Sequence, residues 1–140
     1  MSQEKYRHEA ARWLQQAKAD LEAAKDSRKA EHCEWACFQA QQAAEKALKA
    51  IWFFHCYDPW GHSLVRLVQD FPHADIQTDL RTLTDSAKLL DKLYIPTRYP
   101  NGLPDLTPSD TYTDSEADAA VDAARRVIDN AARELWDNDN

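Results

Sequence analysis

The stretch from Trp35 to Trp52 constrains the fold of this chain more than any other stretch does. It contains neither Gly nor Pro and is dense in Ala, so it predicts one uninterrupted helix. At about 100° per residue, alanines and other apolar residues gather on one face, while Gln, Glu and Lys gather on the other. An alanine-lined face lets a neighbouring helix approach closely. We therefore expect this helix at the centre of a helical bundle.

The polar face of this central helix carries large aromatic side chains near its two ends, which is unusual for a face that only meets water. These side chains are Trp35, Phe38, Trp52 and Phe53. Exposed aromatic patches mark interfaces. We therefore expect a homodimer that forms through this side of the helix, with the first or last helix contributing.

The length and composition indicate a single domain over residues 1–140, with a frayed tail at 137–140. The 140 residues are 44% hydrophobic and include five Trp, which is typical of a folded chain rather than a disordered one.

No apolar run reaches the roughly 18 residues of a membrane span, and the N-terminus lacks a signal peptide's apolar core. The three cysteines suggest no disulfide framework, so we expect a cytoplasmic location. The net charge of −7 disfavours broad coating of nucleic acid but leaves room for a local basic pocket.

Helical periodicity, together with Pro, Gly and capping residues, divides the chain into helices. The expected helices are residues 4–26, a second ending near residue 57, a short third opening at Ser63, a fourth over residues 76–94, and a last one that follows a capping box at 113–116. The turn between the first two falls in the polar segment 26–31. The predicted fold class is all-α: an antiparallel up-and-down bundle of four long helices plus one short helix, with a long Pro-rich loop before the last helix.

This loop of roughly 17 residues is too long for a simple turn, and such loops are usually functional or disordered. It places Arg98 beside Tyr99 and between prolines. A guanidinium and a phenol ring held in this way suit a phosphate and a base. The alternative is that Arg98 ties the loop to a carboxylate while Tyr99 packs on the bundle.

The polar side of the central helix offers further groups for a phosphate, spaced about one turn apart. If the loop folds over this helix, the groups converge on one cleft that suits GTP or ATP. The candidate ligand-binding residues are Gln42, Lys46, Lys49, Arg98 and Tyr99. The alternative is that carboxylates neutralise these cations in ordinary salt bridges, and the candidates for that role are Glu45, Asp91 and Asp105.

Other chemistry finds less support in the sequence. A zinc site could be assembled from Cys33, Cys37, His55, Cys56 and His62. However, no Cys-x-x-Cys pair is present, and buried Cys commonly behaves as a small hydrophobe. With two Gly in the chain there is no Gly-rich phosphate loop, and no nucleophile has an adjacent base. We expect neither a metal nor a cofactor.

Several motifs, taken in order, resemble the HEPN domain, the nucleotide-binding module shared by prokaryotes and higher eukaryotes. They are Ala11-Arg-Trp-Leu14, Asp20-Leu21, the segment 37–50, His62-Ser63-Leu64 and Arg98-Tyr99-Pro100. The resemblance spans nearly the whole chain. The opening helix, the Glu-Trp-Ala-Cys-Phe start of the central helix and the Arg-Tyr-Pro loop are most similar to the sacsin-like branch.

The resemblance implies a helical bundle that dimerises around a cleft where nucleotide binding is proposed. Prokaryotic members often partner a minimal nucleotidyltransferase, as in toxin–antitoxin pairs. The implied function is therefore a nucleotide-binding or regulatory module, which works with such a partner in a paired system. An activity as an enzyme in its own right is not indicated by the residues.

The resemblance also implies an alternative, because some branches are toxins that cleave RNA without a metal. In these, four to six residues stand between an Arg and a later His, and Arg66 and His73, with six residues between them, meet that spacing. Yet Pro72 breaks the helix on which both side chains should sit. Leu67 also stands where nuclease members usually have a polar residue. A third possibility is a dimeric protein-interaction module without a ligand.

Overall fold

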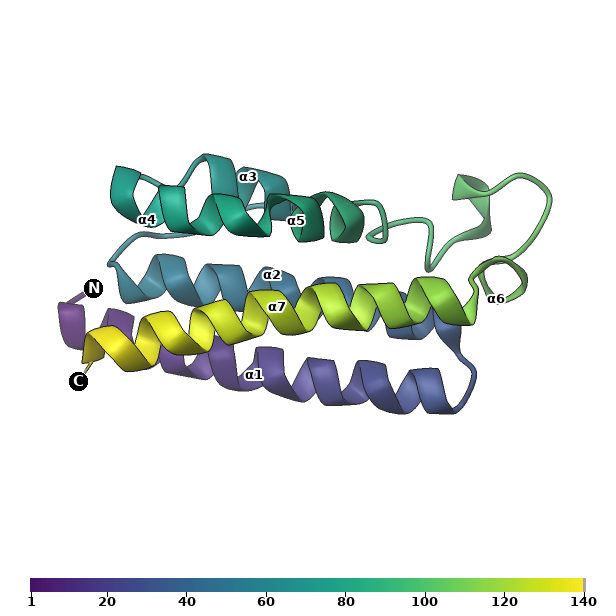
Figure 1. The fold of residues 1–140 in the computed structure, drawn as a ribbon, viewed down its shortest axis with the longest axis horizontal. Helices are drawn as coiled ribbons and strands as arrows, with labels where there is room; N and C mark the ends of the chain where they lie inside the picture. Colours follow the sequence, from purple (N-terminus) through teal and green to yellow (C-terminus); the bar gives the residue numbers. More distant parts are fainter. Residues whose placement is uncertain (140) are drawn as a thin grey trace.

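The chain folds into a bundle of helices that share one long axis (Figure 1). The computed structural model describes residues 1–139, which contain no strand. The helices are α1 (Gln3–Lys29), α2 (Cys33–Phe54), α3 (Leu64–Gln69), α4 (Ala74–Leu80), α5 (Thr84–Asp91), α6 (Pro108–Thr111) and α7 (Asp114–Asp139), with short 3-10 segments η1 (Arg81–Leu83) and η2 (Pro100–Gly102). The predicted all-α bundle is confirmed.

The three long helices α1, α2 and α7 pack against one another, while α3, α4 and α5 lie along the side of α2 opposite α1 (Figure 1). Alanine allows this close packing. The fully buried alanines include Ala17 and Ala24 of α1, Ala40, Ala43, Ala44 and Ala47 of α2, and Ala120, Ala123 and Ala124 of α7. The central position predicted for α2 therefore follows from its alanine face.

The first turn lies later in the chain than the sequence predicts. Helix α1 continues to Lys29 instead of ending near residue 26, and the chain reverses at residues 30–32, where Glu31 has a φ of 65°. The Nε of Arg28 donates to a carboxylate oxygen of Asp118 at the start of α7, at 2.8 Å. This contact with α7 stabilises a last turn that has no apolar stripe of its own.

The sequence predicts one continuous fourth helix over residues 76–94, and this prediction is wrong. The segment is divided into α4, η1 and α5. Threonine hydroxyls donate to backbone carbonyls along this segment: Thr78 to Ala74, Thr82 to Asp79 and Thr84 to Arg81. Such side-chain bonds compete with regular helical bonding and bend helices. The segment is therefore jointed rather than straight.

Capping residues fix the ends of α3 and α7 as the sequence predicts. Ser63 accepts a hydrogen bond from the backbone N–H of Arg66 at 3.2 Å. Thr113 accepts from the N–H of Glu116, and the Glu116 carboxylate accepts from the N–H of Thr113, which completes the capping box. The sequence predicts a frayed tail at 137–140. The side chains of these four residues lie outside the described part of the structure, and the backbone of α7 is described as helical to Asp139.

None of the helices in the described part of the chain combines the length and the apolarity that crossing a membrane requires.

The long connection before α7 contains η2 and α6. It begins with Thr97, which is buried and whose hydroxyl donates to the carbonyl of Leu93 at 2.7 Å. This bond holds the start of the loop against the end of α5.

Replacing Ala44 by Leu should lower the free energy of unfolding by about 1–3 kcal/mol, because the extra methylenes have no space between the helices. Urea unfolding followed by circular dichroism measures this change. Ala11→Leu, on the exposed side of α1, is the matched control and should change stability little. Equal stability of the two variants would contradict close packing at the alanine face.

Candidate functional site

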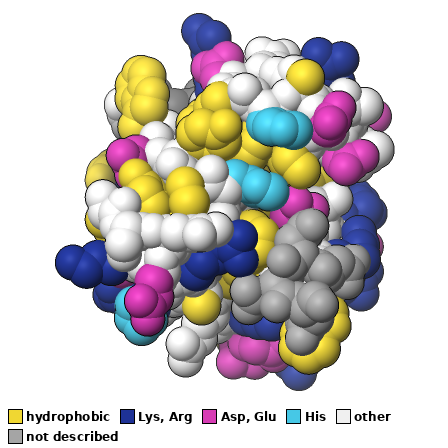
Figure 2. Space-filling view, turned by 90° about the vertical axis from the view of Figure 1, so that its left-hand side faces the viewer, with side chains coloured by type: hydrophobic (Ala, Val, Ile, Leu, Met, Phe, Trp, Pro, Cys, Tyr) yellow, Lys and Arg dark blue, Asp and Glu magenta, His cyan; other side chains and the backbone are white. Residues whose placement is uncertain are grey.

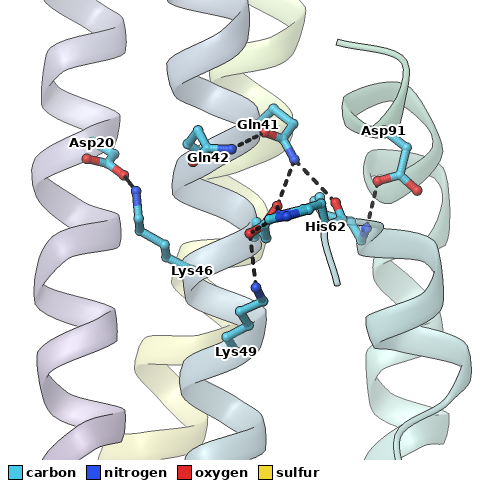
Figure 3. Close-up of polar contacts among 9 residues, drawn as sticks. Asp20, Gln41, Gln42, Lys46, Lys49, His62 and Asp91 are labelled. Atoms are coloured by element: carbon cyan, nitrogen blue, oxygen red, sulfur yellow. Dashed lines mark hydrogen bonds and ion pairs between the residues drawn. The ribbon is translucent and has the colours of Figure 1, made fainter. Parts of the chain in front are cut away.

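The outward face of α2 forms a polar floor between α1 on one side and α3 and α5 on the other (Figure 3). Its side chains are unusually buried: Gln41 is 0% exposed, Glu45 is 5% exposed and Lys49 is 8% exposed. Positions 41, 45 and 49 follow one another at one helical turn, so their side chains lie in a row. Burying charges is costly unless they are paired, and this row must therefore satisfy its own charges.

Glu45 is the residue that binds this row together. Its carboxylate accepts hydrogen bonds from Gln41 at 3.2 Å and Lys49 at 3.1 Å, and lies 3.2 Å from Nδ1 of His62 (Figure 3). Lys49 is thus neutralised by Glu45, as the salt-bridge alternative predicted. The His62 contact adds a residue that the ligand prediction had left out, although it belongs to the His62-Ser63-Leu64 motif.

Lys46 points away from this row and toward α1 (Figure 3). Its Nζ lies 2.5 Å from Oδ2 of Asp20, whose other oxygen accepts from Gln16 at 2.8 Å. Asp20 was missed as a partner by the sequence reasoning. The available signal was its spacing, because Asp20 follows Trp13 by seven residues and so shares the α1 side that faces α2.

Asp91 and Asp105 do not neutralise the cations as the alternative predicted. Asp91 instead accepts hydrogen bonds from the backbone N–H groups of Leu64 at 2.6 Å and Val65 at 3.1 Å. It also accepts from the Ser63 hydroxyl, so that α5 holds the start of α3. Asp105 lies on the exposed loop and pairs with no cation among the described residues.

Arg98 crosses the start of α2, as the cleft prediction required. Its guanidinium carbon lies 4.3 Å from the centre of the Phe38 ring, 4.7 Å from that of Tyr94 and 5.4 Å from that of Tyr99. Its Nε donates to the carbonyl of Tyr94 at 2.9 Å. Among the described residues, no acceptor meets its two terminal nitrogens and no carboxylate pairs with it.

His62 connects the Arg98 cluster to the polar floor. Its ring stacks on Tyr94 with centroids 4.9 Å apart and planes 18° apart. Contacts therefore run from Arg98 through Tyr94 and His62 to Glu45. The structure brings Arg98, Tyr99 and the Lys49 row into one connected region. Lys46 and Asp20 lie beside it, toward α1.

The four aromatic residues predicted at the dimer interface separate into two groups. Trp35 is 47% exposed and packs edge-on against Phe38, with ring centroids 6.2 Å apart. Trp52 is 8% exposed, because α3 covers it and its indole N–H donates to the carbonyl of Leu67 at 3.0 Å. Phe53 packs on Trp13, with centroids 5.5 Å apart. Trp52 therefore belongs to the packing of its own chain, and Trp35 is the residue open to a partner.

The two residues of the candidate nuclease pair do not share one helix. Arg66 is on α3, exposed and 3.7 Å from Asp70, while His73 is the residue that precedes α4. Because α3 ends at Gln69, the break predicted from Pro72 is present. The two side chains make no hydrogen bond with each other among the described residues.

The cysteine and histidine side chains considered for zinc do not assemble. The described residues contain no group of three His, Cys, Asp or Glu side chains arranged to hold a metal. Burial raises the pKa of the Cys37 thiol to about 12, which keeps it protonated. The Cys33 thiol lies 3.2 Å from Asp114, and both burial and this contact raise its pKa.

Comparison with known proteins places this geometry among related structures. The family model described as the HEPN domain matches residues 10–135. A crystal structure of a protein from Thermus thermophilus is similar, with 40% identity, a TM-score of 0.82, and coverage of 89% of this chain and 97% of that one. An archaeal HEPN homologue matches with 33% identity, a TM-score of 0.74, and coverage of 90% and 97%. A HEPN domain protein from Thermotoga maritima matches with 30% identity, a TM-score of 0.67, and coverage of 89% and 98%. Among the curated proteins, none matches.

Replacing Glu45 by Ala should lower the free energy of unfolding by about 3–5 kcal/mol, because Lys49 then stays buried without a counter-charge. Urea unfolding measures this loss. Asp122→Ala is the matched control, since its partner Arg125 is 55% exposed and such surface pairs contribute about 1 kcal/mol or less. The double variant Glu45→Leu/Lys49→Met should recover most of the loss, and a double variant as unstable as Glu45→Ala would contradict the charge argument.

Proposed function

The chain belongs to the HEPN domain family, and we propose that within it the protein is a nucleotide-binding regulatory module. The observation that carries this proposal is the environment of Arg98. The aromatic rings of Phe38 and Tyr94 hold its guanidinium, yet its terminal nitrogens meet no acceptor among the described residues. A planar guanidinium whose two terminal nitrogens are open suits a phosphate, which that edge can contact in a bidentate manner.

Tyr99 supplies the second part of the proposed site. Tyr99 is 51% exposed, and the centre of its ring lies 5.4 Å from the Arg98 guanidinium carbon. An exposed aromatic ring beside a cation provides a stacking surface for a base next to a phosphate contact. The proposed nucleotide therefore has its base on Tyr99 and its first phosphate on Arg98.

The proposed path of further phosphates follows α2. From Phe38 to Lys46 the helix rises by about 12 Å, at about 1.5 Å per residue. The second and third phosphates of a triphosphate cover only part of this length, so on this path they reach Gln42, which lies between the two ends, before Lys46. Lys49 has a smaller role in this proposal, because Glu45 already neutralises it. GTP and ATP remain the candidate ligands.

Charge elsewhere on the molecule supports a local anion site rather than a broad one. At the end of the molecule seen in Figure 2, Lys and Arg side chains alternate with Asp and Glu, and hydrophobic and His side chains lie between them. The chain as a whole has a net charge of −7. A basic surface of the kind that binds nucleic acid without sequence preference would need a large excess of cations.

The wider biological setting is part of the same proposal. We place the protein in the cytoplasm as a homodimer that acts with a minimal nucleotidyltransferase in a paired toxin–antitoxin-type system. Its similarity to the sacsin-like branch is supported by the Arg98-Tyr99-Pro100 loop, which in this fold reaches α2. The single-domain organisation over residues 1–140 belongs to this proposal too.

Two rival functions remain, and each has its own measurement. The ribonuclease alternative requires Arg66 and His73 to act together, so RNA cleavage by the purified protein that His73→Ala abolishes would favour it. The interaction module without a ligand is favoured by the exposed aromatic side chains Trp35 and Trp60, which are 47% and 85% exposed. An absence of nucleotide binding together with a stable dimer would favour this second rival.

Replacing Arg98 by Ala should weaken nucleotide binding at least tenfold, because a charge-assisted hydrogen bond contributes about 1.5–3 kcal/mol. Calorimetric titration of GTP and ATP measures the loss. Arg98→Lys should show an intermediate affinity, since it keeps the charge but loses the planar fork. Arg125→Ala, which removes an exposed guanidinium from α7, is the matched control and should bind as the unaltered protein does. Binding that ignores both Arg98 changes would exclude this site.

Replacing Trp35 by Asp should convert the proposed dimer to a monomer, because it places a charge in the apolar patch formed with Phe38. Light scattering at several protein concentrations measures the molar mass. Trp60→Asp is the matched control, because Trp60 is more exposed but lies in the loop that follows α2. The interface proposal fails if the unaltered protein is monomeric at high concentration, or if Trp60→Asp dissociates the dimer and Trp35→Asp does not.

A further inference from the structure

Tyr94 contacts Arg98 at two points and so holds it over the start of α2. The carbonyl of Tyr94 accepts from Nε of Arg98 at 2.9 Å, and the centre of its ring lies 4.7 Å from the guanidinium carbon. A single hydrogen bond leaves a guanidinium free to turn about that bond, whereas an aromatic ring beside it also limits its plane. The position of the Tyr94 ring therefore decides where the two terminal nitrogens of Arg98 point.

The Tyr94 ring is itself placed by neighbouring rings. Tyr94 is half-buried and lies beyond the end of α5, and its hydroxyl makes no hydrogen bond among the described residues. The His62 ring stacks on it, with centroids 4.9 Å apart and planes 18° apart. The Phe38 ring is farther away, with centroids 6.4 Å apart and planes 38° apart. Of these two rings, that of His62 makes the closer and more nearly parallel contact.

The His62 ring is fixed by α2, although the His62 side chain is 59% exposed. Its Nδ1 lies 3.3 Å and 3.2 Å from the two carboxylate oxygens of Glu45. An ionised carboxylate only accepts hydrogen bonds, so Nδ1 carries the proton and donates. Gln41 donates to the backbone carbonyl of His62 at 3.5 Å (Figure 3). Two buried residues of α2 thus hold both the ring and the backbone of this loop residue.

We propose that His62 is a positioning residue of the proposed nucleotide site. This inference rests on the proposed function, in which Arg98 binds a phosphate. Glu45 fixes the His62 ring, the His62 ring fixes Tyr94, and Tyr94 holds the guanidinium in the orientation that the phosphate meets. An arginine that is already ordered loses less rotamer freedom on binding, so more of the contact energy appears as affinity.

Replacing His62 by Ala should weaken the binding of GTP and ATP about three- to tenfold, which is the cost of ordering one long side chain on binding. Calorimetric titration measures the affinities. His8→Ala is the matched control, because it removes an exposed imidazole from α1. It should bind both nucleotides as the unaltered protein does. Unchanged affinity in His62→Ala would overturn the inference.

Two further substitutions separate the ring of His62 from its bond to Glu45. His62→Asn keeps an N–H donor for the buried carboxylate but removes the ring, and it should bind nucleotide as weakly as His62→Ala. His62→Phe keeps a ring but loses the bond that fixes it, so its affinity should lie between those of His62→Ala and the unaltered protein. Full affinity in His62→Asn would overturn the inference, because His62 would then serve only to satisfy Glu45.

The order of Arg98 can be measured by NMR without any nucleotide. Its Nε–H is protected by the carbonyl of Tyr94. The exchange of this proton with water should become about three- to tenfold faster in His62→Ala and His62→Asn, because the open form of Arg98 gains population by that factor. Unchanged exchange in both variants would contradict the positioning role.

A double variant shows whether His62 acts through Arg98. In the Arg98→Ala background, His62→Ala should cause no further loss of nucleotide affinity, because the residue that it positions is already gone. A further loss would overturn the inference, since it would show that His62 contacts the nucleotide itself.

These outcomes are separable from a failure of the proposed function. If Arg98→Ala weakens nucleotide binding while His62→Ala changes neither the affinity nor the exchange, the proposed function stands and this inference falls. If the exchange becomes faster in the His62 variants but the unaltered protein binds neither GTP nor ATP, His62 positions Arg98 and the proposed function falls.

Discussion

The close approach of α1, α2 and α7 across alanine side chains is the constraint on which the rest of this structure depends. Because Ala43, Ala44 and Ala47 present so little volume, the three long helices pack tightly at these positions on the inner side of α2. The long polar and aromatic side chains of α2 must therefore project to its other side. There they meet α1 on one side and α3 and α5 on the other, so the same packing that builds the core also creates the polar floor.

Charge pairing on that floor follows from its burial. Lys49 is 8% exposed and Lys46 is 26% exposed in its side chain, and each has a carboxylate within 3.1 Å. Arg98 differs, because aromatic rings rather than carboxylates surround it. A guanidinium is more weakly hydrated than an ammonium, so it can rest on rings and keep its terminal N–H groups available. Among these three cations, the structure therefore leaves Arg98 the most able to bind an external anion.

The sequence predicted the elements whose signals are local. The uninterrupted α2, the Ser63 cap and the Thr113–Glu116 capping box depend on residues within a few positions of one another, and all three are present. The errors arose where distant residues decide. Helix α1 extends to Lys29 through a contact with Asp118, and Trp52 is buried because α3 folds back over it. Helical periodicity placed Trp52 on the polar face correctly, but periodicity does not say which neighbouring segment covers a face.

In the candidate site, too, contacts within one helix could be predicted from the sequence, whereas contacts between helices could not. The row at 41, 45 and 49 is a consequence of helical spacing, and the Glu45–Lys49 pair could be predicted from it. The Lys46–Asp20 pair joins residues 26 positions apart and depends on how α1 and α2 are aligned. That alignment is set by the alanine contacts between the two helices. The packing of the core in this way places the Asp20 carboxylate beside Lys46 and influences the charge that the polar floor presents.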